Sequence, residues 1–154
     1  MKILNFIIFT LIISCHTDEK DNNNENHIKS ELTIYDKDGI AVAYCNYSNK
    51  NETIIYLWNG KPTCYYTSEN DDLIYGFNGK FIGWRESGIY YDLNGKRIGF
   101  ENNAINIITH IENVKHIKEI PPIKTVIEFP PQRQFFSVDW SMMKLDSFFL
   151  KGRE

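Results

Sequence analysis

The histidines of this chain are the residues best suited to metal binding or acid–base chemistry, but their spacing supports neither. His110 and His116 are six residues apart, which places them on different faces of a helix and matches no common zinc-binding motif. His16 and His27 belong to a polar N-terminal stretch. We therefore expect structural or solvent-exposed histidines, and neither a metal nor another cofactor.

Nucleophilic chemistry has one candidate, the tripeptide Asp139-Trp140-Ser141. A serine nucleophile needs a neighbouring base and a sharp turn that exposes its hydroxyl, and no such turn motif surrounds Ser141. Helix capping is the simpler interpretation of Asp139 or Ser141, and a hydrolase-like activity built on them is the alternative. Asp36 and Asp92 occupy equivalent repeat positions, where exposure near two turns is a simpler explanation than a catalytic carboxylate pair. We therefore predict a protein that is not an enzyme.

Asp36 and Asp92 belong to four copies of one short motif between Leu32 and Glu101. In each copy an Asn-Gly or Asp-Gly pair is flanked by alternating apolar residues. This is the strongest short-range signal for a β-hairpin, because both turn residues can adopt positive φ. Turn-to-turn spacings of 21, 19 and 16 residues leave room for one hairpin and one connection per copy, which is too short for a propeller blade. The turn glycines are Gly39, Gly60, Gly79 and Gly95.

The turn type decides which side chains share a face of each hairpin. A two-residue turn at Asn59-Gly60 would pair Tyr56 with Thr63. Ile55 would then pair with Cys64 on the opposite face, since faces alternate along a strand. One face collects aromatic and β-branched residues from all copies, so we predict that it forms the common core and buries its tyrosines. The other face has small residues opposite large ones, which indicates close backbone approach. The repeated tyrosines are Tyr35, Tyr56, Tyr75 and Tyr91, and the small residues are Ala43, Cys64, Gly83 and Gly99.

The repeats have Ile-Tyr before the turn, Asn-Gly-Lys at it and Gly-Trp or Gly-Phe after it. In this they resemble the 4-fold β-flower family, a bacterial domain family of unknown biochemical role. The resemblance covers residues 31–101 and extends more loosely to the tail. It implies a mainly β fold in which four consecutive hairpins are arranged with pseudo-fourfold symmetry around a shared core. The chain departs from the pattern at Pro62 and at the first turn, Asp38-Gly39-Ile40, and neither departure prevents a hairpin. Trp-Gly-type bacterial repeats are a looser alternative.

The C-terminal extension, residues 102–154, differs in composition from the repeats. Between Ala104 and Lys118 the apolar residues recur at helical spacing, although a strand over 105–108 is the alternative because β-branched residues disfavour helix. Two Pro-Pro pairs nine residues apart exclude helix and central strand, so we expect extended, polyproline II-like chain packed along the domain. A short helix is then expected to bury Met142, Leu145, Phe148 and Phe149.

The N-terminus predicts export and lipid attachment. An apolar run over residues 3–13 is too short to span a membrane and is typical of a secretory signal. The sequence Ile12-Ile13-Ser14-Cys15 resembles the lipobox of bacterial lipoproteins. This resemblance implies that residues 1–14 are removed as a signal peptide and that Cys15 carries the lipid.

Residues 15–30 are almost entirely polar, so we expect a flexible tether between the lipid and the repeat domain, residues 31–101. His16 rather than an aspartate follows the cysteine. By resemblance to the lipoprotein sorting rule, this favours the outer membrane and leaves open which side the domain faces. Removal of residues 1–14 takes away one lysine and no acid, which changes the net charge from −3 to −4. A negative chain argues against nucleic acid as a partner.

The aromatic content favours a binding or structural module for a protein or a glycan. Trp58 and Trp84 offer a large contact area with a polar tip. Lys61, Lys80 and Lys96 follow three of the turn glycines and are expected to surround one end of the domain, where they are solvated or meet an anionic partner. An assembly role, with hairpin edges or the proline-rich tail docking on a partner, is the alternative.

Cys45 and Cys64 are the two cysteines outside the lipobox. In an oxidising compartment they can form a disulfide if neighbouring hairpins dock suitably. Buried free thiols are the default expectation.

Overall fold

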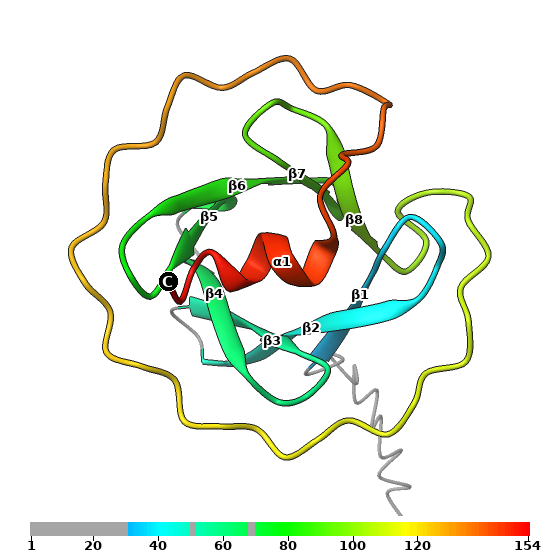
Figure 1. The fold of residues 1–154 in the computed structure, drawn as a ribbon, viewed down its shortest axis with the longest axis horizontal. Coiled ribbons are helices and arrows are strands. Elements are labelled where there is room, and N and C mark those ends of the chain that lie inside the picture. The colour runs from blue at the N-terminus through cyan, green and yellow to red at the C-terminus, as the bar shows by residue number, and fades with distance from the viewer. Residues whose placement is uncertain (1–30, 50–51, 68–69) are drawn as a thin grey trace, which may run out of the picture.

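The computed structural model describes residues 31–49, 52–67 and 70–154, and the predicted signal peptide, Cys15 and tether lie outside these ranges. Eight antiparallel strands form a closed barrel, with each strand next to its sequence neighbours (Figure 1). The fold is therefore mainly β and contains the four predicted hairpins. The elements are β1 (Glu31–Tyr35), β2 (Ala41–Asn49), β3 (Glu52–Leu57), β4 (Pro62–Thr67), β5 (Asn70–Gly76), β6 (Phe81–Glu86), β7 (Ile89–Tyr91), β8 (Arg97–Glu101) and α1 (Leu145–Leu150).

The barrel closes where its first and last strands meet. β1 and β8 pair through two residue pairs, Ile34 with Glu101 and Tyr35 with Phe100. The hairpin pairs are longer, as in β3 and β4, where the register runs from Glu52–Thr67 to Tyr56–Pro62. Closure removes the open sheet edges that would otherwise invite pairing with other chains.

The hairpin turns contain three residues rather than the predicted two. In the second hairpin the Gly60 N–H donates to the Leu57 carbonyl and the Leu57 N–H donates to the Lys61 carbonyl, both at 2.9 Å. Gly60 has φ +84°, as expected where a type I turn is followed by a left-handed residue. Tyr56 consequently pairs with Pro62 instead of Thr63, while the predicted pair Ile55–Cys64 is present. The other three hairpins show the same shift in register.

The interior of the barrel is lined by the face with the small residues, so the prediction that the tyrosine face forms the central core is wrong. Ile34, Ile55 and Ile74 are fully buried in one cluster with side chains of α1. The shift in register adds Ile82 and Ile98 to this interior. The small residues leave room for α1, since a Cβ on Gly83 would meet the Phe148 ring at 2.9 Å. The predicted close approach is therefore made by the C-terminal helix.

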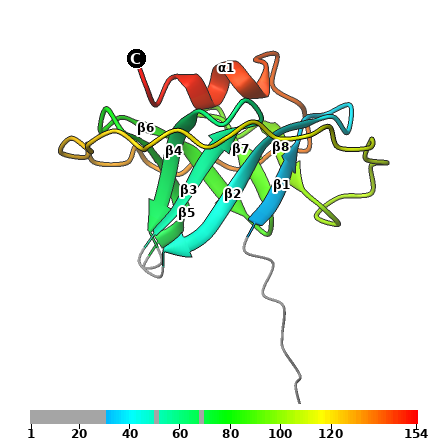
Figure 2. The ribbon, with the colours of Figure 1, turned by 90° about the horizontal axis from the view of Figure 1, so that it is seen from below.

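The helix α1 lies across one end of the barrel (Figures 1 and 2). Leu145, Phe148 and Phe149 are buried as predicted. Met142 is 98% exposed, so its predicted burial is wrong. The capping prediction is also wrong, because the N-cap residue is Lys144 and no side chain caps the helix.

Between the barrel and α1, residues 105–138 run around the outside of the barrel; we call this segment the belt (Figure 1). The belt contains neither helix nor strand, so both predictions for residues 104–118 are wrong. The prediction that the proline-containing tail is extended and packs along the domain is confirmed. Figure 2 shows the belt nearer the α1 end than the end where β1 begins.

The belt is hydrogen-bonded to the turn glycine of every hairpin. Four belt N–H groups, spaced nine residues apart, donate to the carbonyls of the four turn glycines. The bonds run from His110 to Gly39 (2.9 Å), from Glu119 to Gly60 (2.9 Å), from Glu128 to Gly79 (3.0 Å) and from Ser137 to Gly95 (2.8 Å). Nine residues of extended chain cover about 28 Å at the polyproline II rise, and one stretch of this length connects each pair of neighbouring turns.

Candidate functional site

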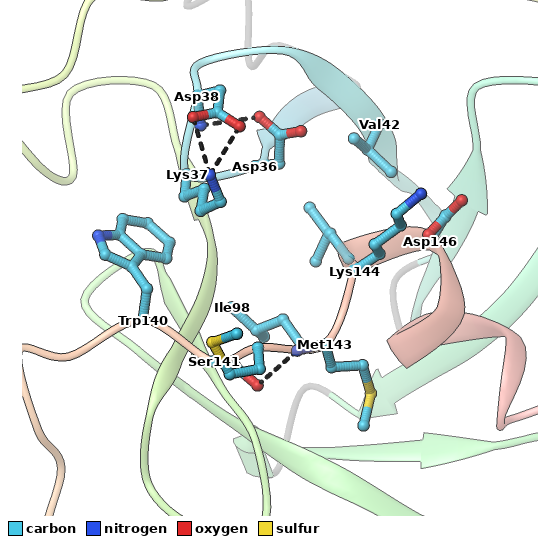
Figure 3. A pocket seen from close by; sticks show the side chains of 12 residues that line it. Asp36, Lys37, Asp38, Val42, Ile98, Trp140, Ser141, Met143, Lys144 and Asp146 are labelled. Carbon is cyan, nitrogen blue, oxygen red and sulfur yellow. Dashed lines mark hydrogen bonds and ion pairs between the residues drawn. The ribbon is translucent and has the colours of Figure 1, made fainter.

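A cavity of about 550 Å³ opens between the first hairpin turn and the segment that leads into α1 (Figure 3). This size lies within the range of small-molecule and peptide-anchor sites. Its apolar wall includes Val42, Ile98 and Leu145, from the barrel and the helix. Trp140 and two methionines, Met142 and Met143, come from the connecting segment. Lysines and aspartates of the first hairpin turn and of the start of α1 complete the lining: Asp36, Lys37, Asp38, Lys144 and Asp146.

Trp140 is held in place by hydrogen bonds between its two neighbours in sequence and Arg97 of β8. The Arg97 N–H donates to the Asp139 carbonyl at 2.9 Å, and the Ser141 N–H donates to the Arg97 carbonyl at 2.7 Å. These bonds make a short parallel bridge between Arg97 and Trp140. The Trp140 ring meets Phe100 edge-on, with 6.3 Å between ring centroids. The aromatic side of the cavity is therefore built by tertiary contacts, which no local sequence motif predicts.

The carboxylates Asp36 and Asp92 hold turn backbone in place. Asp36 Oδ1 accepts hydrogen bonds from the N–H groups of Asp38 and Ile40, both at 3.0 Å. Asp92 Oδ1 accepts the equivalent bonds from Asn94 and Lys96, at 2.9 and 3.0 Å. Asp92 is only 6% exposed, so the expected solvent exposure is wrong for this residue.

Ser141 is bound to one of these carboxylates. Its hydroxyl donates to Asp92 Oδ2 at 2.7 Å, and its oxygen accepts the Met143 N–H at 3.3 Å. A serine nucleophile needs an acceptor that takes up its proton during attack, normally an imidazole. Here the hydroxyl instead connects the tail to the fourth hairpin turn, and Asp139 is exposed at the surface. The arrangement is that of a structural serine.

The repeated tyrosines form a second aromatic layer between the barrel and the belt. Tyr35 and Tyr56 are each 4% exposed, so the predicted burial of the repeated tyrosines is confirmed although they lie on the outer face. Tyr65, which belongs to the same layer, is also 4% exposed. Belt cations cover these rings. Lys124 Nζ lies 3.8 Å from the Tyr65 ring centroid, and burial lowers the pKa of this lysine. Cation–π contacts of this kind are strengthened when the cation is desolvated.

The tryptophans singled out in the sequence belong to this layer. Trp84 is 1% exposed and therefore presents no surface to a partner. Trp58 is half-buried, its Nε1 donates to the Asn113 carbonyl at 3.2 Å, and Lys115 Nζ lies 5.1 Å from its ring. Both tryptophans therefore help to seat the belt.

The turn lysines lie beside the turn glycines at one end of the barrel, as their sequence positions require. Lys80 is exposed, whereas Lys61 and Lys96 are partly buried. Their backbone N–H groups are held by turn side chains, since Lys61 donates to Asn59 Oδ1 at 3.1 Å and Lys80 donates to Asn78 Oδ1 at 3.0 Å.

A buried polar cluster lies inside the barrel. Tyr90 donates to Glu101 Oε1 at 2.9 Å, and Arg85 forms two hydrogen bonds with the same carboxylate, at 2.7 and 2.9 Å. Cys45 Sγ lies 3.2 Å from the Tyr90 hydroxyl and accepts a hydrogen bond from Tyr66 at 3.4 Å. Burial raises the pKa of the Cys45 thiol to about 12, so this cysteine is a neutral thiol near pH 7.

Cys45 and Cys64 are both buried and free, so no disulfide joins them. Cys64 Sγ donates to the Phe149 carbonyl at 3.2 Å, which connects the second hairpin to α1. His110 and His116 are exposed on the belt. Within residues 31–49, 52–67 and 70–154, no group of three or more His, Cys, Asp and Glu side chains is placed to hold a metal ion. Within the same ranges, no helix is both long and apolar enough to cross a membrane.

A family model described as "4-fold beta flower protein" matches residues 32–149, which is more than half of the chain and includes the belt and most of α1. No curated protein and no solved structure matches the chain significantly.

Proposed function

We propose that this chain, which belongs to the 4-fold beta flower family, acts as a lipid-anchored, non-catalytic binding module of a bacterial cell envelope. The anchor is Cys15 of the lipobox-like sequence, and the outer membrane is the compartment that His16 favours. The binding surface is the cavity beside α1, and its ligand is a segment of a protein.

The lining of the cavity carries this proposal. An apolar wall flanked by both lysines and aspartates suits a peptide segment with an apolar anchor and charged neighbours. Met142 is 98% exposed and Met143 is 36% exposed, and flexible methionine side chains adapt to varied partners. A glycan would favour a freely exposed ring, whereas Trp140 is half-buried against Phe100.

A non-catalytic role is supported by how the polar groups near the cavity are used. Asp36 holds the first turn, and Ser141 bonds to Asp92 in the fourth. Groups that take part in the chemistry of an enzyme usually point toward a substrate position. Here Asp36 bonds within its own turn, and Ser141 connects the fourth turn to the tail.

The test is site-specific photocrosslinking in intact cells that produce the full chain. A photoreactive amino acid at Met142 lies at the cavity, and one at Leu93, which is 47% exposed on the fourth turn, serves as the matched control. We expect a discrete protein adduct from position 142 at a yield at least fivefold above that from position 93. Lys144→Glu, which reverses one charge of the lining, should lower this yield.

Equal yields from both positions would contradict the proposed binding surface. The anchor is tested separately by labelling with a radioactive fatty acid. Incorporation into the parent chain and its loss in Cys15→Ser are expected, and an unlabelled parent chain would contradict lipid attachment.

A further inference from the structure

The outward side of the belt carries a row of apolar side chains at every third residue. From Ile108 to Val138, ten of the eleven positions at this spacing are Ile, Val or Phe, and Gln132 is the exception. All ten are at least 71% exposed. They are Ile108, Ile111, Val114, Ile117, Ile120, Ile123, Val126, Phe129, Phe135 and Val138.

The three-residue spacing follows from the extended conformation of the belt. A polyproline II helix has three residues per turn, so each third of its residues shares one side. One third faces the barrel, where Lys115, Lys118 and Lys124 cover tyrosine rings. Another third donates its N–H groups to the turns, as His110 and Glu119 do. The remaining third is the apolar row, whose side chains are at least 71% exposed on the outward side of the belt.

The shape of the row argues against a rigid protein surface or a second copy as its partner. The belt passes around the barrel as a single chain (Figures 1 and 2), so its row of exposed apolar residues follows a convex line. Against a flat or convex protein only a few of its side chains can make contact, far below the roughly 800 Å² per partner of a standard interface. A fluid acyl boundary, in contrast, accepts separate protruding side chains.

The position of the tether selects one part of the row. Glu31, the first described residue, forms one ion pair with Lys115 at 2.9 Å and another with Lys118. Burial alone would raise the pKa of Glu31, but its hydrogen bonds with Lys118 and Lys115 keep it below the ordinary value. Glu31, the residue at which the tether joins the domain, therefore lies beside this stretch of belt. We call its outward residues the tether-side arc: Val114, Ile117, Ile120 and Ile123, each at least 90% exposed.

We infer that the tether-side arc inserts into the lipid headgroup–acyl boundary of the membrane that holds the anchor. This inference rests on the lipid anchor of the proposed function. Residues 16–30 span at most about 50 Å when extended, so the arc and the anchor reach the same membrane. Contact is side-on, with the barrel axis along the membrane plane, because the α1 end presents exposed polar residues such as Asp146 and Ser147. A single acyl chain binds a membrane only marginally and reversibly, so a second contact strengthens attachment.

The experiment is flotation with vesicles of phosphatidylethanolamine and phosphatidylglycerol. The protein is the mature chain, residues 15–154, with Cys15→Ser, so that no acyl chain contributes. We expect this chain to float with the vesicles at millimolar lipid. The double variant Ile117→Ser/Ile120→Ser should reduce the bound fraction at least fivefold.

The matched control is Phe135→Ser. Phe135 is fully exposed and lies by the fourth turn, opposite the tether-side arc, which is centred on the second. Its removal should change the bound fraction less than twofold. Both altered sites are at the surface, and unchanged thermal unfolding will show that the variants are folded.

A chain that stays at the bottom of the gradient, or that loses equal binding through Phe135→Ser, overturns the inference. Failure of flotation leaves the fatty-acid labelling and the crosslinks from Met142 unaffected, so the two proposals fail separately. A photoreactive amino acid at Ile120 tests the alternative. Protein crosslinks from this position in cells, together with a failure to float, would identify the row as a protein contact.

Discussion

At the scale of single residues, the four hairpin turns solve one problem in two ways. The backbone N–H that follows each turn glycine needs an acceptor. In the first and fourth turns it donates to the aspartate before the turn, Asp36 or Asp92. In the second and third it donates to the turn asparagine, Asn59 or Asn78. The irregular distribution of aspartate among the repeats therefore reflects turn chemistry.

Gly60 shows how strictly a turn residue is selected here. Its φ of +84° disfavours any side chain, and a Cβ would overlap the belt carbonyl of Ile117. We predict that Gly60→Ala lowers the free energy of unfolding by at least the roughly 1–3 kcal/mol that left-handed strain costs. Urea denaturation followed by tryptophan fluorescence measures this change.

The control for this prediction is Gly88→Ala, which has φ +78° but whose added Cβ would meet only side-chain atoms of Ala104 and Glu101, at 3.1 Å or more. If both variants lose equal stability, the contact between the second turn and the belt contributes nothing measurable.

At the scale of elements, the helix and the belt show what periodicity can and cannot predict. The apolar spacing Leu145, Phe148, Phe149 predicted a helix with one buried face, and α1 has that face. The spacing of isoleucine and valine from Ile108 to Ile117 also resembles a helix over short stretches, because each three-residue step falls only 60° short of a full helical turn. Over thirty residues a strict period of three drifts all the way around a helix, and this is the signal that identifies extended chain.

We predict that Phe149→Ala removes a large part of the stability of the fold. Phe149 is fully buried and its ring contacts Tyr90 at 5.8 Å and Phe148 at 5.2 Å between centroids. Loss of a core phenylalanine costs about 3–5 kcal/mol. Met142→Ala, at a 98% exposed position, should change the free energy of unfolding by less than about 0.5 kcal/mol.

Calorimetry on both variants distinguishes a helix that closes the barrel from one that rests on it. A Phe149→Ala transition temperature equal to that of Met142→Ala would show that α1 adds little to the barrel.

At the scale of the whole molecule, the repeats predicted the family and the four hairpins, and the family match and the fold confirm both. They could not predict which face is interior. The three-residue turn moves residues such as Ile82 and Ile98 to the other face, and both faces are apolar because the tail covers one and fills the other. The repeats could not predict the cavity either. Lys37 and Met143 are about a hundred residues apart, and the path of the belt brings them together.

The burial of acidic hydroxyls and thiols makes the whole fold sensitive to alkali. Burial raises the pKa of Cys45 from 9 to about 12, and that of Tyr35 and Tyr44 from 10 to about 12. The folded state thus binds these protons more tightly than the unfolded state. The stability they contribute is complete below pH 9 and is lost as the pH rises toward 12.

We therefore predict a lower urea midpoint at pH 10.5 than at pH 8. Cys45→Ala removes one of the three groups and should make the decline between pH 9 and 10.5 smaller. A midpoint that is constant over this range would contradict the assigned burial.

The two-pair closure between β1 and β8 has a consequence for where the molecule comes apart. A barrel built from consecutive hairpins closes at one strand pair, which here is β1 with β8. The first stretch of the belt leaves the end of β8 and crosses to the first hairpin. There Tyr35 donates to Glu112 at 2.6 Å and the Gly39 carbonyl accepts the His110 N–H. A single backbone cut at residues 106–108 would break this connection between β8 and the first hairpin. The β1–β8 pairing would then close the barrel without it, so unfolding should begin between these two strands.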